Sequence, residues 1–151
     1  IYCGTPPVQH LWAMREALDM LFEEGLENVW ERHRVLAEAV RAAVEAWHSP
    51  NGLSFNIASP ESRSNSVTTI LTGDVNASEL RRIAESNAGL TLGIGLDEFV
   101  DRAFRIGHMG HLNPPMILGT LGTIEATLTA MGAPMSKSGV AAAAAVIGAA
   151  L

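Results

Sequence analysis

The sequence predicts an α+β fold, in which helices pack on one face of a small, mostly antiparallel sheet. The order of the patterns is the first observation: two helical segments, two strand-like runs, a helix, two further strand-like runs and a last helix. The alternation at residues 103–108 is the second, because it gives one row of side chains to a core and leaves the other row open. A chain of 151 residues is long enough to bury such a core.

Two long helices are expected in the first third of the chain. Thr5 is a good N-cap and Pro6 a good first helical residue, and apolar residues then recur at helical spacing. Gly25 interrupts this pattern. Residues 27–47 continue as a second helix, because opposite charges recur three or four positions apart along them.

The sheet and the remaining helices follow. Four short β-rich runs are expected to form one sheet, at residues 53–57, 66–71, 90–94 and 103–108. A polar stretch at residues 74–79 begins a helix that continues to about Asn87, and Pro114 opens a further helix. The last apolar run, residues 140–151, is too short to span a bilayer and is expected to form a helix packed on the domain or across a subunit contact, with a membrane anchor as a remote alternative.

Composition excludes several classes of function. The net charge is −6 and the basic residues are dispersed among glutamates, which argues against a nucleic-acid-binding surface. Cys3 is the single cysteine, so no internal disulfide is possible and a reducing cytoplasm is the expected compartment. His108 and His111 lie three positions apart without a third ligand in register, so no metal site is expected. No membrane contact is expected either.

Arg105 is the candidate binding residue. Alternation places Phe104 and Ile106 toward the core and Arg105 on the opposite face, where its neighbours Ala103 and Gly107 are very small. A planar carboxylate could approach there and accept two parallel hydrogen bonds from the guanidinium. From the residues alone, a solvated arginine on the open face of a sheet remains the simpler alternative.

Residues 103–110, with the sequence AFRIGHMG, resemble the Arg-Ile/Val-Gly-x-Met-Gly segment near the end of a known enzyme family. This family is the class V, fold type I pyridoxal phosphate aminotransferases, in the alanine/serine–glyoxylate branch. The stretch YCGTPPV at residues 2–8, with LWAMREAL and EEGLENVWERH after it, resembles the same family. The resemblance covers nearly all of residues 2–131 and implies a C-terminal portion. In it, residues 1–26 link from a large cofactor-binding domain and residues 27–151 form the small domain.

The resemblance also implies site residues, a cofactor and a reaction. Arg105 would bind the substrate carboxylate, while Tyr2 and Thr5 would reach the phosphate of pyridoxal 5'-phosphate held by the other subunit of a homodimer. The implied reaction moves an amino group from alanine, serine or aspartate to a 2-oxo acid such as glyoxylate or pyruvate. From the residues alone, a plain helix cap is the favoured interpretation of Thr5, and a buried tyrosine with a satisfied hydroxyl is the favoured interpretation of Tyr2.

The lysine that binds the cofactor covalently in this family has no counterpart here, nor do the aspartate that pairs with its pyridine nitrogen and the aromatic residue that stacks on its ring. Lys137 is the only lysine, and its surroundings do not resemble the cofactor-binding lysine, so it is expected to be an exposed charge beside a helix start. The chain begins at Ile1 and is interpreted as a fragment with no catalytic residue, inactive on its own. Two alternatives stay open: a fold type I lyase or desulfurase, and a standalone α+β module for small-molecule binding or dimerisation.

Overall fold

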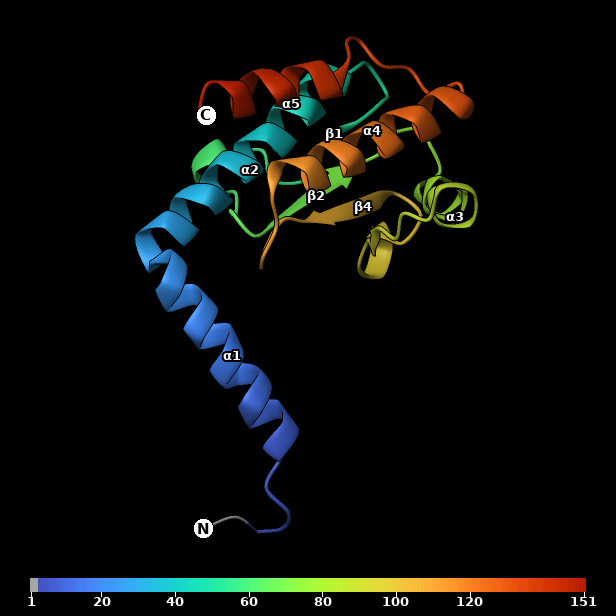
Figure 1. The fold of residues 1–151 in the computed structure, drawn as a ribbon. Coiled ribbons are helices and arrows are strands. Elements are labelled where there is room, and N and C mark those ends of the chain that lie inside the picture. The colour runs from blue at the N-terminus through green and yellow to red at the C-terminus, as the bar shows by residue number, and fades with distance from the viewer. Residues whose placement is uncertain (1–2) are drawn as a thin grey trace. The chain divides into compact units, whose positions relative to one another are not determined.

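A computed structural model describes residues 3–151 and divides the chain into two compact units, one ending at Arg32 and the other comprising His33–Leu151. The boundary lies inside the helix α2, Leu26–Trp47. The ribbon in Figure 1 labels the helices of both units and the strands β1, β2 and β4. Tyr2, a predicted cofactor-binding residue, lies outside the described residues.

The first unit contains helix α1, Val8–Glu24, and the first residues of α2. Thr5 is not the N-cap of α1, so that prediction was wrong: Pro7 occupies the cap position and makes no side-chain cap bond. The physical reason is the Pro-Pro pair. A residue that precedes a proline disfavours the α conformation, so Pro6 cannot serve as the first helical residue.

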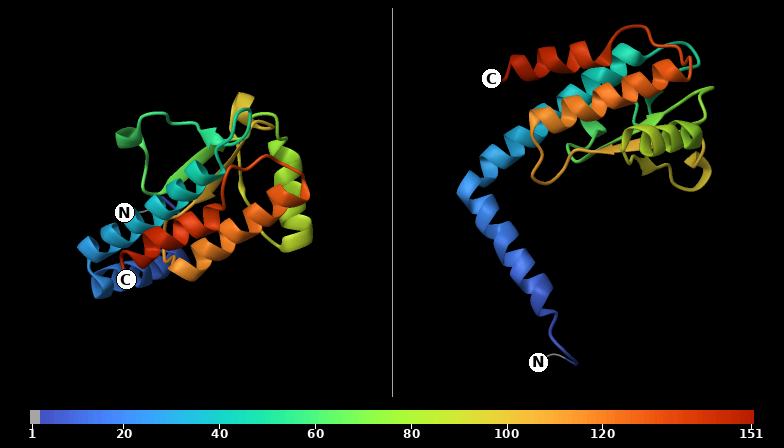
Figure 2. Two further views of the ribbon diagram at one scale, coloured as in Figure 1. Left: turned by 90° about the horizontal axis from the view of Figure 1, so that it is seen from above. Right: turned by 45° about the vertical axis from the view of Figure 1, so that its right-hand side comes forward.

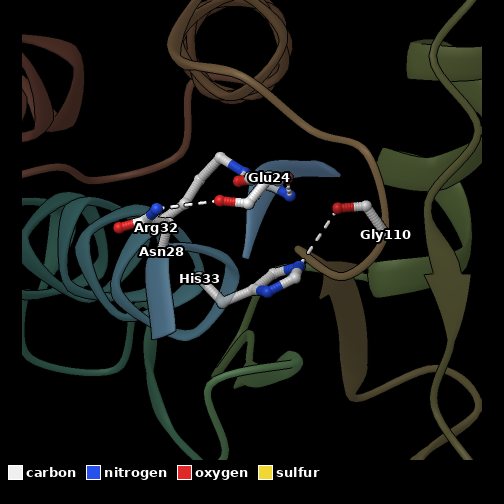
Figure 3. A network of polar contacts seen from close by, with 5 residues as sticks. All are labelled: Glu24, Asn28, Arg32, His33 and Gly110. Atoms are coloured by element: carbon white, nitrogen blue, oxygen red, sulfur yellow. Dashed lines mark hydrogen bonds and ion pairs between the residues drawn. The ribbon is translucent and has the colours of Figure 1, made fainter. Parts of the chain in front are cut away.

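Gly25 separates α1 from α2, as the sequence predicted, and a polar network holds this junction together (Figure 3). Gly25 has a φ of 86°, which a glycine adopts without steric cost. The Glu24 carboxylate accepts hydrogen bonds from Arg32 Nε at 2.6 Å and Nη2 at 2.8 Å, and Asn28 Nδ2 donates to the Glu24 carbonyl at 2.8 Å. The bond to Glu24 raises the pKa of Arg32. The two helices are therefore tied together by a two-pronged ion pair.

The second unit is built on one four-stranded sheet, which confirms the predicted α+β class. Its strands are β1 (Ser54–Phe55), β2 (Val67–Leu71), β3 (Gly93–Ile94) and β4 (Ala103–Gly107). They lie in the order β1-β2-β4-β3, and every pair is antiparallel. The register sets Thr69 opposite Arg105. The edge strand β3 is shorter than predicted, because Gly89 ends the preceding helix in the left-handed conformation and the Leu90 N–H bonds back to Ala84.

Helices cover one face of this sheet, as Figures 1 and 2 show for α4 and the part of α2 in the second unit, while α5 packs on the outer side of these two helices. The bounds are Ala77–Ala88 for α3, Pro114–Ala130 for α4 and Gly139–Gly148 for α5. The side chains of Asn76, Asn113 and Ser138 cap them. The buried core joins helix and sheet residues, among them Leu36, Val40, Ile70, Leu80, Phe104, Ile106, Leu121, Ile124 and Ile147. None of the described helices combines the length and apolarity needed to cross a membrane.

Glu125 on α4 ties three helices together. Its Oε2 accepts hydrogen bonds from the Trp47 indole N–H at 2.8 Å and from the backbone N–H groups of Gly139 at 2.7 Å and Val140 at 3.1 Å, and its Oε1 accepts from Ser138 at 2.8 Å. Burial acts to raise the pKa of Glu125, but these hydrogen bonds outweigh it and the pKa lies below its usual value. The carboxylate thus satisfies the N-terminus of α5 and the only polar atom of a buried tryptophan.

His108 is a buried imidazole just after β4. Nδ1 lies 3.0 Å from the Asn65 carbonyl, which can only accept, so Nδ1 carries the proton. Nε2 then accepts from the Thr68 hydroxyl at 2.9 Å. Burial is the main cause that lowers the pKa of His108, and the positive charge of Arg41 adds to it. His108 is therefore a neutral, fully bonded core residue.

Candidate functional site

Arg105 stands on the sheet face that the helices leave uncovered. Its neighbours Phe104 and Ile106 are buried in the core on the other face, while Arg105 is only half-buried. This is the side on which alternation along β4 predicted it. Arg105 lies on the central strand β4, which pairs with β2 over its whole length and with β3 on its other edge. The backbone of Arg105 is therefore held on both sides.

One nitrogen of the Arg105 guanidinium is already bound. Nε donates a hydrogen bond of 2.8 Å to the carbonyl of Ile94 on the edge strand β3. Within residues 3–151, Nη1 and Nη2 make no hydrogen bond or ion pair. The terminal end of the guanidinium is therefore available for an incoming acceptor.

Gly93 lies directly opposite Arg105 in the β3–β4 pair. A Cβ added at Gly93 would come within 3.0 Å of the Arg105 Cβ and 3.5 Å of its Nε. The aliphatic part of the Arg105 side chain thus occupies the space that a side chain at residue 93 would need. Glycine in a strand interior often marks such a close approach.

A cavity of about 350 Å³ lies at this face of the sheet. Sheet residues and the loop that follows β3 form its lining, namely Asn56, Val67, Thr69, Arg105 and residues 96–99. Asp97 and Glu98 from this loop bring two carboxylates to the lining, yet neither forms an ion pair with Arg105 in the described part of the chain. The cavity therefore offers one cation whose charge is not neutralised by direct contact.

This arrangement suits a planar anion. Because Nε is occupied, a carboxylate can approach the Nη1 and Nη2 end and accept two parallel, charge-assisted hydrogen bonds. The cavity that Arg105 lines, and the open space next to Gly107, where an added Cβ would meet nothing within 4 Å, leave the room that such a group needs.

The other predicted residues lie elsewhere. Thr5 belongs to the first unit, is exposed, and its hydroxyl makes no hydrogen bond with another described residue. Lys137 is an exposed residue directly before the cap of α5, as predicted, and its backbone N–H bonds to the Ala46 carbonyl at 2.9 Å. Within the second unit, Arg105 lines the cavity and Lys137 does not.

Two features of the cavity were not recognised in the sequence. Gly93-Ile94-Gly95 indicated only a tight turn, and the following acidic loop indicated only a solvated surface. In the structure, the Ile94 carbonyl accepts a hydrogen bond from Arg105 Nε, and Asp97 and Glu98 lie in the cavity lining. The signal that could have revealed them was Gly93, a glycine inside a strand-like run.

Comparison with known proteins reveals relatives over nearly the whole chain. No protein-family model matches it. It is 46% identical to a serine–glyoxylate aminotransferase of Methylorubrum extorquens and 43% identical to one of Arabidopsis thaliana, in each case over 92% of this chain and 34% of the relative. The chain thus spans about a third of the length of these curated relatives.

The fold comparison agrees. The crystal structure of pyridoxamine–pyruvate aminotransferase from Mesorhizobium loti superimposes with a TM-score of 0.90 and 34% sequence identity, over 100% of this chain and 38% of that one. Sequence and fold therefore each match about a third of an aminotransferase. The chain is similar in sequence and in fold to the C-terminal portion of class V aminotransferases, among them serine–glyoxylate aminotransferases.

Proposed function

We propose that the full-length protein that carries this chain is a pyridoxal phosphate-dependent aminotransferase, which moves an amino group between a small amino acid and a 2-oxo acid. The relationship to glyoxylate aminotransferases supports the reaction class. The names of two relatives favour serine as donor and glyoxylate as acceptor, with alanine, aspartate and pyruvate as further candidates. Transamination is favoured over a lyase or desulfurase activity for the same reason.

Arg105 is the observation that carries this proposal. Arg105 lines a cavity of about 350 Å³, and its Nη1 and Nη2 atoms have no hydrogen-bond or ion-pair partner among residues 3–151. The amino acid and the 2-oxo acid share one group, the carboxylate next to the reacting carbon. One fixed guanidinium can therefore hold both substrates in the same orientation, so that the reacting carbon of each is aligned before the reaction.

The residues of this chain fit one end of the cofactor. Thr5 offers an exposed hydroxyl, and Gly4, with a φ of 139° and open space where a Cβ would be, lets a ligand approach the backbone. Thr5 and Tyr2 would hold the phosphate of a cofactor bound by the partner subunit of a homodimer. Lys137 does not fit the role of the cofactor-binding lysine, because it follows α4 in an exposed loop. When bound, pyridoxal phosphate supplies the stabilisation of the carbanion.

The test is to replace Arg105 in the full-length enzyme. We expect Arg105→Ala to raise the KM of amino acid and 2-oxo acid together, because a charge-assisted bond pair of this kind is worth about 2–5 kcal/mol. Arg105→Lys keeps the charge but loses the two-pronged contact, so it should fall between parent and alanine variant.

Arg82→Ala is the matched control. Arg82 is an exposed arginine on α3 whose guanidinium pairs with Glu79, so its loss removes the same charge far from the sheet face. Unchanged KM values in Arg105→Ala would contradict the proposed role, whereas a rise in both variants would indicate a general effect of charge.

A further inference from the structure

We propose that Gly93 is a positioning residue for Arg105. Its missing side chain lets the Arg105 stem lie against β3, where the Ile94 carbonyl holds Nε and turns the Nη1 and Nη2 end toward the cavity. The substrate carboxylate is then bound end-on, by the two terminal nitrogens. This inference rests on the proposed function of Arg105 as the carboxylate-binding residue.

The close approach of the two strands is the first argument. A Cβ at Gly93 would lie 3.0 Å from the Arg105 Cβ and 3.2 Å from the Arg105 carbonyl oxygen. Directly opposite residues in antiparallel strands usually keep their Cβ atoms about 4.5–5.5 Å apart. Any side chain at Gly93 would therefore push β3 and β4 apart or displace the arginine stem.

The hydrogen bond to Ile94 is the second argument. Arg105 Nε donates to the Ile94 carbonyl at 2.8 Å, and a backbone carbonyl can only accept, so this bond does not depend on pH in the working range. A guanidinium carries five N–H donors in a rigid, planar fork. Because Nε is already bound to Ile94, Nη1 and Nη2 are the two nitrogens that can still donate parallel hydrogen bonds to one carboxylate.

The surroundings agree with this geometry. Asp97 and Glu98 line the same cavity but make no ion pair with Arg105 in residues 3–151, so nothing in this part of the chain competes for the Nη atoms. The Ile94 bond therefore supplies the orientation that a charged partner would otherwise supply. Gly93 is the position where a single added methyl group, in contact with the Arg105 stem, can disturb this orientation while Arg105 itself stays unsubstituted.

The experiment uses the full-length holoenzyme and propionate, a carboxylate without an amino group, as the probe. The dissociation constant of propionate is measured from the visible absorbance of the bound cofactor, together with KM and kcat for serine. Gly93→Ala should raise the dissociation constant of propionate and the KM of serine, each by about 10- to 100-fold, with a smaller change in kcat. The control is Gly119→Ala on α4, where a Cβ meets nothing within 4 Å, and it should bind propionate like the parent.

The outcomes separate this inference from the proposed function. If Arg105→Ala binds propionate as the parent does, Arg105 is not the carboxylate site and the proposed function fails. If Arg105→Ala loses binding while Gly93→Ala keeps it, only the positioning role is overturned.

A second measurement covers the case that Gly93→Ala does not fold. The ¹⁵N signals of the Arg105 guanidinium in the parent enzyme are assigned by their loss in Arg105→Lys. End-on binding shifts the Nη signals when propionate is added and leaves Nε in place. A shift of Nε as large as that of the Nη signals would overturn the inference.

Discussion

Removing the Glu125 carboxylate should destabilise the second unit by a predictable amount. In Glu125→Ala, four hydrogen bonds are lost: those from Trp47, Ser138, Gly139 and Val140. The buried Trp47 N–H is left without a partner, which costs about 1–3 kcal/mol. The loss of an acceptor at the N-terminus of α5 adds about 0.5–2 kcal/mol. We therefore expect a total of about 2–5 kcal/mol.

Glu125→Gln separates shape from charge. The amide oxygen can keep the bonds from Trp47, Gly139 and Val140, and the amide nitrogen can donate to the Ser138 hydroxyl, so the loss should be about 1 kcal/mol. Because the pKa of Glu125 is lowered in the folded chain, its stabilisation is present above the unfolded value of about 4.3 and disappears as the pH falls through the folded value. The glutamine variant should lack this part of the acid sensitivity.

Urea unfolding of the 151-residue chain, followed by circular dichroism at pH 7 and at pH 4, measures both effects. Glu85→Gln serves as the control, because this exposed glutamate on α3 has only a 3.4 Å contact from the Thr91 hydroxyl. It should change stability by less than about 0.5 kcal/mol. A Glu125→Ala variant within that same margin would refute the idea that the carboxylate holds α5 in place.

Three further predictions follow from single sites. Since the pKa of His108 is lowered, the parent should lose stability as the pH falls below about 6.5, and His108→Gln should show a flatter dependence between pH 7.5 and 5.5 in urea unfolding. Gly73→Ala should cost more than about 3 kcal/mol, because φ is 59° and the new Cβ would lie 2.0 Å from the Asn51 carbonyl oxygen; a melting temperature equal to the parent's would contradict this. Tyr2→Phe with Thr5→Ala in the full-length enzyme should speed cofactor release and weaken the dimer; release as slow as the parent's would exclude the phosphate role.

The central part of the fold was predictable from the sequence because local patterns there agree with tertiary packing. Burial alternates over residues 104–108, because the structure buries Phe104, Ile106 and His108 while Arg105 stays half-exposed. Ala103 departs from this pattern, since it lies on the side of Arg105 and is nevertheless fully buried. The helix from Pro114 begins where the proline predicts it, and the structure adds Asn113 as its cap. Local propensity and the core favour the same conformation at these positions, which makes the prediction robust.

The start of α1 shows where single-residue preferences mislead. Thr5 and Pro6 each suit a helix N-terminus, but Pro7 changes the conformation that Pro6 can adopt. The apolar spacing along α1 did predict a helix, although the structure leaves Trp12 and Phe22 each 68% exposed. The spacing of apolar residues identifies the apolar face of a helix, while the burial of that face depends on which other element packs against it.

The orientation of Arg105 depends on contacts that no local pattern contains. The Nε bond joins residues eleven positions apart, and it exists only because the β3–β4 register sets Gly93 opposite Arg105 and not one residue to either side. A shift of one residue would place Ile94 opposite Arg105 and move the arginine stem away from β3. The sequence could therefore place Arg105 on the open face, because alternation is local. It could not say which nitrogens remain free, and this is the property that decides how a carboxylate is bound.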